Sequence, residues 1–386
     1  MKNFIILIAC AFCIGSCQQT PRDFTQTYPL IDRKETLKNG KEWENMHNLY
    51  TRLAESIRKK PAVAKPYVEM AELFMVEARV TGEHGHYYPM ALKLIETAQS
   101  INPEDPDLKF RALSDKASVL LSLHQFQNAK TTADEAIKSN PYNAQIYGAL
   151  VDANVELGNY PEAVANADKM VSIRPDLRSY SRVSYLREIY GDLNGAIDAM
   201  KQAVEAGYPG YEETCWTRLQ LGNLYKKQGR NDLAENEFQQ ILSERPNYAF
   251  ALSALAEMHM DKNELATADK LLSKAIAIMP EVHFYILKAE VQQKSGQVKE
   301  AMTIAREVLD MLKDDEKAGH RMDLTYAQVY QHLLQDPQTS LQYAMKEYEI
   351  RPDNVEVNKY LVDLYTQMGD TQNAILHKAK MTPAKI

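Results

Sequence analysis

Three of the four cysteines in this 386-residue chain lie within its first 17 positions. Disulfide pairing, metal binding and processing of the terminus all compete as explanations. Cys10 and Cys13 have the C-x-x-C spacing of redox sites. They lie in and just after an apolar run over residues 4–12, which follows Lys2. A helix needs about 20 apolar residues to span a bilayer, so this shorter run predicts a secretory signal peptide that would remove both cysteines.

Cys17 differs from the other two because small residues precede it. The stretch IGSC that ends at Cys17 resembles the lipobox of bacterial lipoproteins. This resemblance implies that residues 1–16 are a signal peptide and that Cys17 becomes the first mature residue, with a lipid on its sulfur. Gln18, rather than Asp, follows, and the sorting rules of such lipoproteins then imply the outer membrane, facing the periplasm. An ordinary signal peptide with an incidental cysteine is the alternative.

A second group with chemical potential is the pair His84 and His86, with Glu83 beside it. Such a pair could contribute ligands to zinc. No third or fourth ligand is recognisable nearby, so we interpret the stretch as a polar loop with two exposed imidazoles and expect no metal. The chain also lacks G-x-S-x-G, H-E-x-x-H and a phosphate-binding Gly-Lys-Ser/Thr loop. We therefore expect neither an enzyme nor a cofactor.

The composition points to a folded protein that does not bind nucleic acid. Hydrophobic residues make up 45% and charged residues 25% of the chain, which is ordinary for a folded domain. The net charge is −7, and Lys and Arg are mixed with Asp and Glu instead of forming a basic block. Neutralising phosphates requires clustered basic residues. The many acids are expected to form solvated helix surfaces.

An internal repeat organises the chain beyond its first 60 residues. One alanine recurs every 33 to 38 residues, and Ser340 replaces it in one unit: Ala91, Ala129, Ala163, Ala196, Ala234, Ala268, Ala301 and Ala374. Prolines follow these positions by twelve residues in six units: Pro103, Pro141, Pro175, Pro246, Pro280 and Pro352. A fixed period of this length indicates a stack of similar structural units.

The fifth unit carries the pattern most fully, with Gly222, Tyr225, Ala234, Phe238 and Pro246 in order. It resembles the tetratricopeptide repeat family, whose unit is a helix–turn–helix of about 34 residues. The resemblance implies an all-α fold, an α-solenoid in which about nine repeats form a right-handed superhelix. Each hairpin buries its apolar stripe by stacking on a neighbour. Glycines are expected in the turns between paired helices, where the backbone is left-handed: Gly158, Gly191, Gly229, Gly296 and Gly369.

The repeat also sets the expected boundaries. Residues 17–40 would be the lipidated cysteine and a polar tether, 41–64 an N-terminal capping helix, 65–378 the array, and 379–386 a tail. The first unit has an insertion of eight residues around 79–89. The unit at 321–352 is degenerate, with Asp336 and Pro337 where the turn should be.

In the tetratricopeptide family, certain first-helix residues line a concave groove. Their equivalents here are expected to bind a protein or peptide partner: Arg178, Arg182, Tyr185, Trp216, Gln220, Asn223, Lys226, Phe250 and Glu257, with His283 and Glu290 in the next unit. Aromatic and Arg side chains commonly anchor interfaces. The alternatives are that Trp216 and Phe250 pack between repeats and that the arginines pair with nearby acids.

Some family members clamp the C-terminal carboxylate of a peptide with a Lys, two Asn and a basic pair. Arg178 and Arg182 match that basic pair. The two preceding repeats carry Ser114, Ser118 and Ala149 in place of the Lys and the two Asn. The clamp is incomplete, so we do not predict this specificity.

The leading hypothesis is a lipid-anchored scaffold that binds a protein or peptide partner in the bacterial cell envelope and contacts the membrane through the lipid on Cys17. By family analogy, outer-membrane assembly or secretion would suit it. The alternative is a glycan-binding lipoprotein of a nutrient uptake system, because helices of this kind also scaffold such proteins. Its aromatic contacts would come from Tyr87 and Tyr88 in the insertion.

Overall fold

Side chains cap the first turn of several helices in this chain. Asp105 accepts hydrogen bonds from the backbone N–H groups of Asp107 and Leu108, and Pro106 occupies the first helical position. Asp176 forms a capping box with Ser179. Such caps satisfy N–H groups that have no partner inside the helix, and proline is well suited to the first position because its missing N–H is not needed there.

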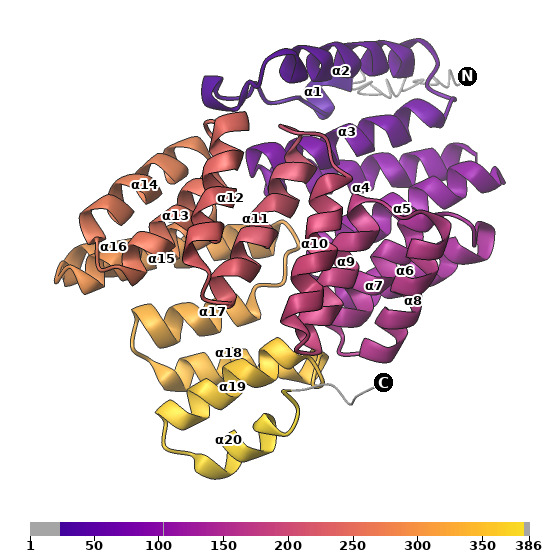
Figure 1. Ribbon diagram of the computed structural model, residues 1–386. Coiled ribbons are helices and arrows are strands. Elements are labelled where there is room, and N and C mark those ends of the chain that lie inside the picture. The colour runs from indigo at the N-terminus through magenta and orange to yellow at the C-terminus, as the bar shows by residue number, and fades with distance from the viewer. Residues whose placement is uncertain (1–23, 103, 382–386) are drawn as a thin grey trace, which may run out of the picture.

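The computed structural model describes residues 24–102 and 104–381 (Figure 1). Its α-helices are α1 (Phe24–Thr27), α2 (Lys41–Lys59), α3 (Lys65–Thr81), α4 (His84–Ile101), α5 (Pro106–Ser122), α6 (Phe126–Ser139), α7 (Ala144–Glu156), α8 (Tyr160–Ile173), α9 (Leu177–Ile189), α10 (Leu193–Glu205), α11 (Glu212–Lys227), α12 (Asn231–Glu244), α13 (Ala249–Asp261), α14 (Leu265–Ile278), α15 (Val282–Lys294), α16 (Val298–Lys317), α17 (Asp323–Gln328), α18 (Pro337–Ile350), α19 (Val355–Gln367) and α20 (Thr371–Lys378). A short 3-10 helix, η1 (Glu35–Leu37), precedes α2, and a π-helical turn, η2 (Val329–Leu333), extends α17. None of these described helices is long and apolar enough to cross a membrane.

From α3 to α20 the helices pair into consecutive hairpins, and each hairpin packs against the next. First helices of successive hairpins also contact one another directly, as α3 does α5, α5 does α7 and α7 does α9. This contact places the odd-numbered helices on the inner side of the curve. The prediction of an all-α solenoid is confirmed.

The turns between paired helices have the left-handed backbone that their glycines predict. All five glycines named above have φ between 77° and 82°, a region that costs glycine little. Where a repeat lacks this glycine, His124, Asn263 and Gln335 adopt the same left-handed conformation. Gly222 has a different role, because a Cβ placed on it would lie 2.3 Å from Cε1 of the fully buried Phe238.

Residues 24–40, the described part of the expected tether at residues 17–40, pack against the array. Phe24, Leu30 and Ile31 pack against the core of the first hairpin. Leu37 contacts the core formed by α13, α14 and α15. These apolar side chains are scattered among polar ones, so the segment has no helical stripe in its sequence, yet together they reach two separate apolar cores.

A buried arginine fixes the same segment to the array. The Arg33 side chain is fully buried, and its Nη2 lies 2.5 Å from Oε1 of Glu77 on α3. Its Nη1 lies 2.8 Å from Oε1 of Glu42 on α2, and the other oxygen of Glu42 lies 2.9 Å from Nη1 of Arg245, the residue after α12. The first hairpin is thereby joined, through α2, to the fifth.

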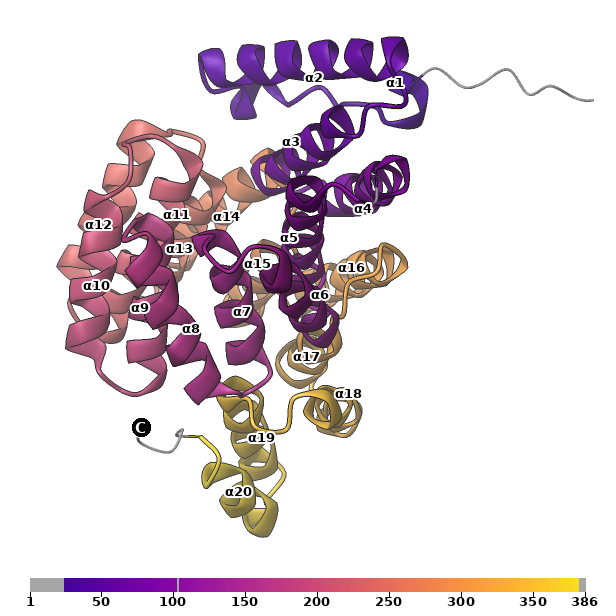
Figure 2. The same cartoon turned by 90° about the vertical axis from the view of Figure 1, so that its right-hand side faces the viewer.

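The array also turns back on itself (Figure 2). The loop between α16 and α17 reaches the α5–α6 turn, where the Arg321 N–H donates to the Leu123 carbonyl at 3.1 Å. The loop before α19 reaches the end of α7, where Asn354 Nδ2 donates to the Glu156 carbonyl at 3.0 Å. We call this junction of the second and third hairpins with the eighth and ninth the seam.

Candidate functional site

The residues predicted to line a groove do lie together on α9, α11 and α13, which are first helices on the inner side of the curve. We call this surface the inner wall. Capping by Asp176 sets the start of α9, and so the direction in which Arg178 and Arg182 project one turn apart.

Both arginines of the inner wall are paired with acids on neighbouring repeats. Arg178 forms an ion pair with Glu213 on α11. Arg182 donates from Nε and Nη2 to the two carboxylate oxygens of Asp152 on α7, at 2.8 and 2.5 Å. The alternative anticipated from the sequence is therefore the one observed, and the pairs link three successive repeats.

The aromatic residues form a row across the inner wall. The Trp216 ring lies edge-on to that of Phe250, with centroids 5.4 Å apart, and Phe250 lies 5.3 Å from Phe284 of the next repeat. Phe250 thus packs between repeats, which is the alternative to partner binding that the sequence left open. Trp216 remains 44% exposed and Tyr185, on α9, 45% exposed. The pKa of Tyr185 is raised by burial and by the charges of Glu156 and Glu356, acids from two sides of the curve.

Polar residues complete the inner wall. Lys226 Nζ lies 3.2 Å from both Glu257 and Asp261, and Glu257 also lies 3.4 Å from His283 Nε2. Burial alone would raise the pKa of Glu257, but His283 and Lys226 outweigh it and hold that pKa below its usual value. Gln220 and Asn223 contact each other at 3.4 Å, and burial raises the pKa of Glu290.

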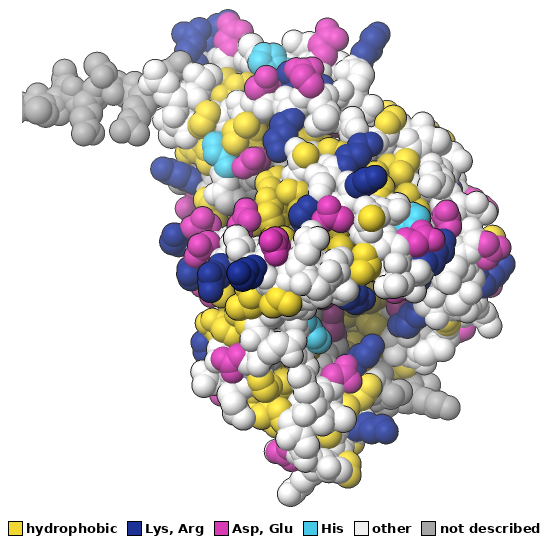
Figure 3. Space-filling view, turned by 90° about the vertical axis from the view of Figure 1, so that its left-hand side faces the viewer, with side chains coloured by type: hydrophobic (Ala, Val, Ile, Leu, Met, Phe, Trp, Pro, Cys, Tyr) yellow, Lys and Arg dark blue, Asp and Glu magenta, His cyan; other side chains and the backbone are white. Residues whose placement is uncertain are grey.

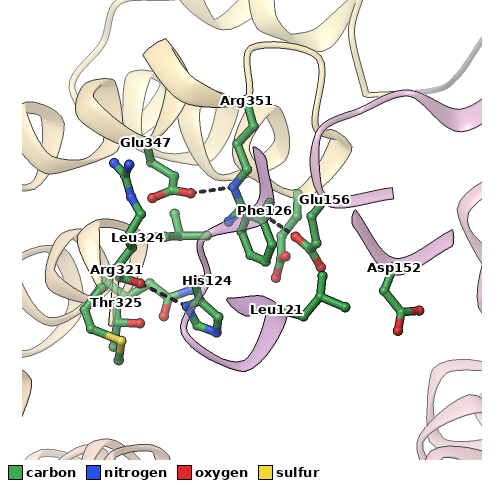
Figure 4. Close-up of a pocket in the computed structure, with 13 residues that line it drawn as sticks. Leu121, His124, Phe126, Asp152, Glu156, Arg321, Leu324, Thr325, Glu347 and Arg351 are labelled. Atoms are coloured by element: carbon green, nitrogen blue, oxygen red, sulfur yellow. Dashed lines mark hydrogen bonds and ion pairs between the residues drawn. The ribbon is translucent and has the colours of Figure 1, made fainter. Parts of the chain in front are cut away.

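The seam contains a cavity of about 360 Å³ that the sequence did not suggest (Figure 4). Arg351 is its central group: its guanidinium pairs with Glu156 and with Glu347, and lies 5.1 Å from the centre of the Phe126 ring. Burial raises the pKa of Glu156 to about 7, although the charge of Arg351 opposes this. His124 Nδ1 lies 2.9 Å from the Arg321 carbonyl. Groups almost 200 residues apart build this site, so no local motif marks it.

The stretch interpreted as an exposed histidine loop is instead the start of α4. The expected insertion lengthens α3 and α4, with only residues 82 and 83 between them. His84 stacks on Tyr88 and on His320 from the α16–α17 loop, and burial lowers its pKa to about 4. His86 Nε2 lies 3.0 Å from the Pro29 carbonyl. No group of three or more potential metal ligands occurs in the described ranges.

Tyr87 and Tyr88, the aromatic residues on which the glycan alternative depended, lie in the core. Tyr87 is fully buried, and its hydroxyl accepts a hydrogen bond from the Ile31 N–H at 3.1 Å. They are aromatic residues that fill space between helices, and neither can stack on a sugar.

The two serines that replace the clamp residues are bound to their own helix. Ser114 donates to the Phe110 carbonyl at 2.8 Å and Ser118 to the Ser114 carbonyl at 3.0 Å. Cys215 is buried, and burial raises its pKa to about 11, so it is not a reactive thiolate at neutral pH. Cys17 lies outside the described residues.

Charges are mixed on the outer surface. Figure 3 shows Lys and Arg side chains interspersed with Asp and Glu on one face of the array. Elsewhere in the described chain, exposed Lys and Glu side chains pair between helices, as Lys262 does with Glu235 and Lys227 with Glu188. Exposed pairs of this kind contribute little to stability.

Comparisons with known proteins agree with this architecture. A family model described as Tetratricopeptide repeat matches residues 114–177 and 219–282. The Protein SGT1 homolog of Oryza sativa subsp. japonica is 31% identical over 97 residues, which span only a quarter of each chain.

Two solved structures resemble most of the array. A chain of the APC/C hetero-tetramer Cut9-Hcn1 matches 85% of this chain with 61% of its own length, at a TM-score of 0.54 and 16% identity. A chain of the human IFIT1 dimer with PPP-AAAA matches 82% of this chain with 72% of its own length, at a TM-score of 0.52 and 14% identity. At such identities the likeness shows the fold alone, an α-solenoid of stacked helical hairpins.

Proposed function

We propose that this α-solenoid, two segments of which match a tetratricopeptide repeat model, binds a protein or peptide partner on the inner wall and acts without covalent chemistry. The observation that carries the proposal is the exposure of Trp216 and Tyr185 within the curve. Large aromatic side chains contribute most to binding when a partner covers them, and both lie among satisfied polar groups that would form a rim.

The arrangement of the ion pairs supports the same surface. Arg178 and Arg182 are held in place by acids on adjacent helices. Their remaining N–H groups can donate to a partner without reorganising, and a preorganised surface loses less conformational entropy on binding. The inner wall therefore combines fixed donors with an aromatic anchor.

The test compares two exposed aromatic residues in a pull-down from detergent extracts of the native cells. Trp216→Ala removes the proposed anchor, and Tyr142→Ala, on the α6–α7 loop and 79% exposed, is the matched control. We expect the first variant to lose partners that the wild type and the control retain. Identical partners for all three proteins, with unchanged melting temperatures, would refute the role of the inner wall.

We further propose that the chain is lipid-anchored at Cys17 in the outer membrane of the bacterial cell envelope, facing the periplasm. Packing of Phe24 against the first hairpin supports a close attachment. Seven steps along the chain separate Cys17 from Phe24, each at most about 3.6 Å, so the first hairpin would lie within roughly 25 Å of the bilayer surface. Incorporation of labelled palmitate into the wild type, and none into Cys17→Ala, is the expected result.

In that position the protein would hold its partner beside the membrane, and a role in outer-membrane assembly or secretion is the one we favour. Capture of the partner by crosslinking in intact envelopes tests this role. A partner that is neither an envelope component nor a secreted protein would contradict it.

A further inference from the structure

An acidic side chain is buried without a partner on the inner side of the first repeats. Asp115 lies on α5 and is 4% exposed. Its Oδ2 has no hydrogen-bond partner among residues 24–102 and 104–381. Asp115 lines a cavity of about 520 Å³ formed by α3, α5 and the start of α7, which is remote from the seam and from Trp216.

The charged groups nearby do not satisfy this carboxyl. Arg111, one turn before it on α5, donates instead to Glu72 on α3 at 2.7 Å. Burial and the charge of Glu72 raise the pKa of Asp115 to about 8, and Arg111 opposes this only in part. The cavity residues contributed by α7 and the loop before it, Asn143 among them, are uncharged.

An unpaired buried carboxyl costs a protein stability, and an amide or an apolar residue of similar size would avoid that cost. Packing in this repeat does not require an acid, because the equivalent position, 14 residues before the repeat alanine, carries no acid in the next five units: it is Ala149, Arg182, Gln220, Ala254 and Leu287. Perturbed ionisable groups that face a cavity are more often found at binding sites than elsewhere.

The cavity has the chemistry of a receptor for a cation. Its lining contains four carboxylates, Glu72, Asp105, Asp107 and Asp115, and two cations, Lys65 and Arg111. Asp105 is occupied in capping α5, and Glu72 in binding Arg111. Asp115 is left as the acceptor at the base. The amides of Asn140, Asn143 and Gln145 lie on the rim. The oxygens of Asn140 and Asn143 already accept from backbone N–H groups two residues further along the chain, at 3.1 and 2.9 Å, so their NH2 groups are left to donate to the carbonyls of a peptide.

We propose that this cavity binds a lysine or arginine side chain of a protein partner, with the cationic group donating to Asp115 and the partner backbone lying against the rim amides. The site goes beyond the proposed function because it lies on α3, α5 and α7, whereas the inner wall lies on α9, α11 and α13. At neutral pH the bound cation displaces the proton of Asp115 to solvent, so charge is conserved in the site.

The test is calorimetric titration of the full chain, purified in detergent, with acetyl-Ala-Ala-Lys-Ala-Ala-amide, its arginine counterpart and its norleucine counterpart. Above about pH 8 we expect the cationic peptides to bind at least about tenfold more tightly than the norleucine peptide. Affinity should fall up to about tenfold per pH unit on acidification below the pKa of Asp115, because the proton then competes with the peptide. Binding near pH 7 should release up to one proton to the buffer. Because phosphate and Tris have different protonation enthalpies, the heats of binding measured in the two buffers should differ accordingly.

Two variants complete the design. Asp115→Asn keeps the shape of the side chain and should abolish both the preference for a cation and the proton release. Glu104→Gln removes an exposed carboxylate that precedes the same helix and does not line the cavity, and it should retain both. No preference for the cationic peptides, or equal loss in the two variants, would overturn the proposal. The outcome at Trp216 is measured separately, so either proposal can fail while the other stands.

Discussion

Asp115 also provides a quantitative test of the buried inner surface, independent of any ligand. Its pKa rises from 3.8 to about 8 on folding. Between these values the folded chain holds a proton that the unfolded chain has lost, so stability falls as pH rises through this window. The slope is about 1.4 kcal/mol per pH unit, which places the cost on the order of 4 kcal/mol at pH 7. Below about pH 4 both states hold the proton and the cost disappears.

Asp115→Asn removes the titrating group and should therefore be more stable than the wild type at neutral pH. The assay is urea unfolding followed by far-UV circular dichroism at several pH values between about 5 and 8. Burial also raises the pKa of Glu156, Glu281 and Asp315, to about 7, 7 and 6, and these acids lower stability with rising pH in both proteins. Their contribution cancels in the difference between the two free energies of unfolding.

The predicted difference widens steadily with pH. Glu104→Gln controls for the loss of one carboxylate, because Glu104 is exposed and lies just before the same helix. A difference between wild type and Asp115→Asn that stays constant from about pH 5 to 8 would refute the reasoning, because it would mean that the native carboxyl is as well solvated as the unfolded one.

Three further substitutions test other parts of the structure. Arg351→Ala leaves the buried Glu347 and the partly buried Glu156 unpaired at the seam and should cost about 3–5 kcal/mol in urea unfolding. The radius of gyration measured by scattering should increase; an unchanged radius would mean that the seam does not hold the array closed. Gly222→Ala forces a methyl group against Phe238 and should cost about 1–3 kcal/mol despite the better helix propensity of alanine; a gain in melting temperature would contradict the close helix contact. Arg33→Ala leaves Glu77 buried without its partner and should cost about 3–5 kcal/mol, whereas a loss below about 1 kcal/mol would fit a solvated tether.

The sequence predicted those features that depend on neighbours within one repeat. The turn glycines mark left-handed positions, because these follow from the geometry of a single hairpin. The positions of Arg178 and Trp216 on a shared wall followed from the repeat register. These features needed no knowledge of how the array curves.

Features that depend on the path of the whole array could not be predicted in this way. Arg33 binds a glutamate 44 residues away and Arg351 one 195 residues away. In the sequence both look like ordinary surface charges. Asp115 was equally inconspicuous, because the expectation for any acid on a repeat helix is solvent exposure, and its burial arises only when α3 and α7 pack beside α5.

The central claim is that a partner occupies the inner wall at Trp216. Its most direct measurement is site-specific photocrosslinking in the native cells, with a benzophenone amino acid placed at position 216 or, as the exposed control, at position 142. We predict a partner adduct at position 216 and none at position 142. Adducts at position 142 alone, or equal adducts at both, would contradict the account and place the binding surface outside the curve.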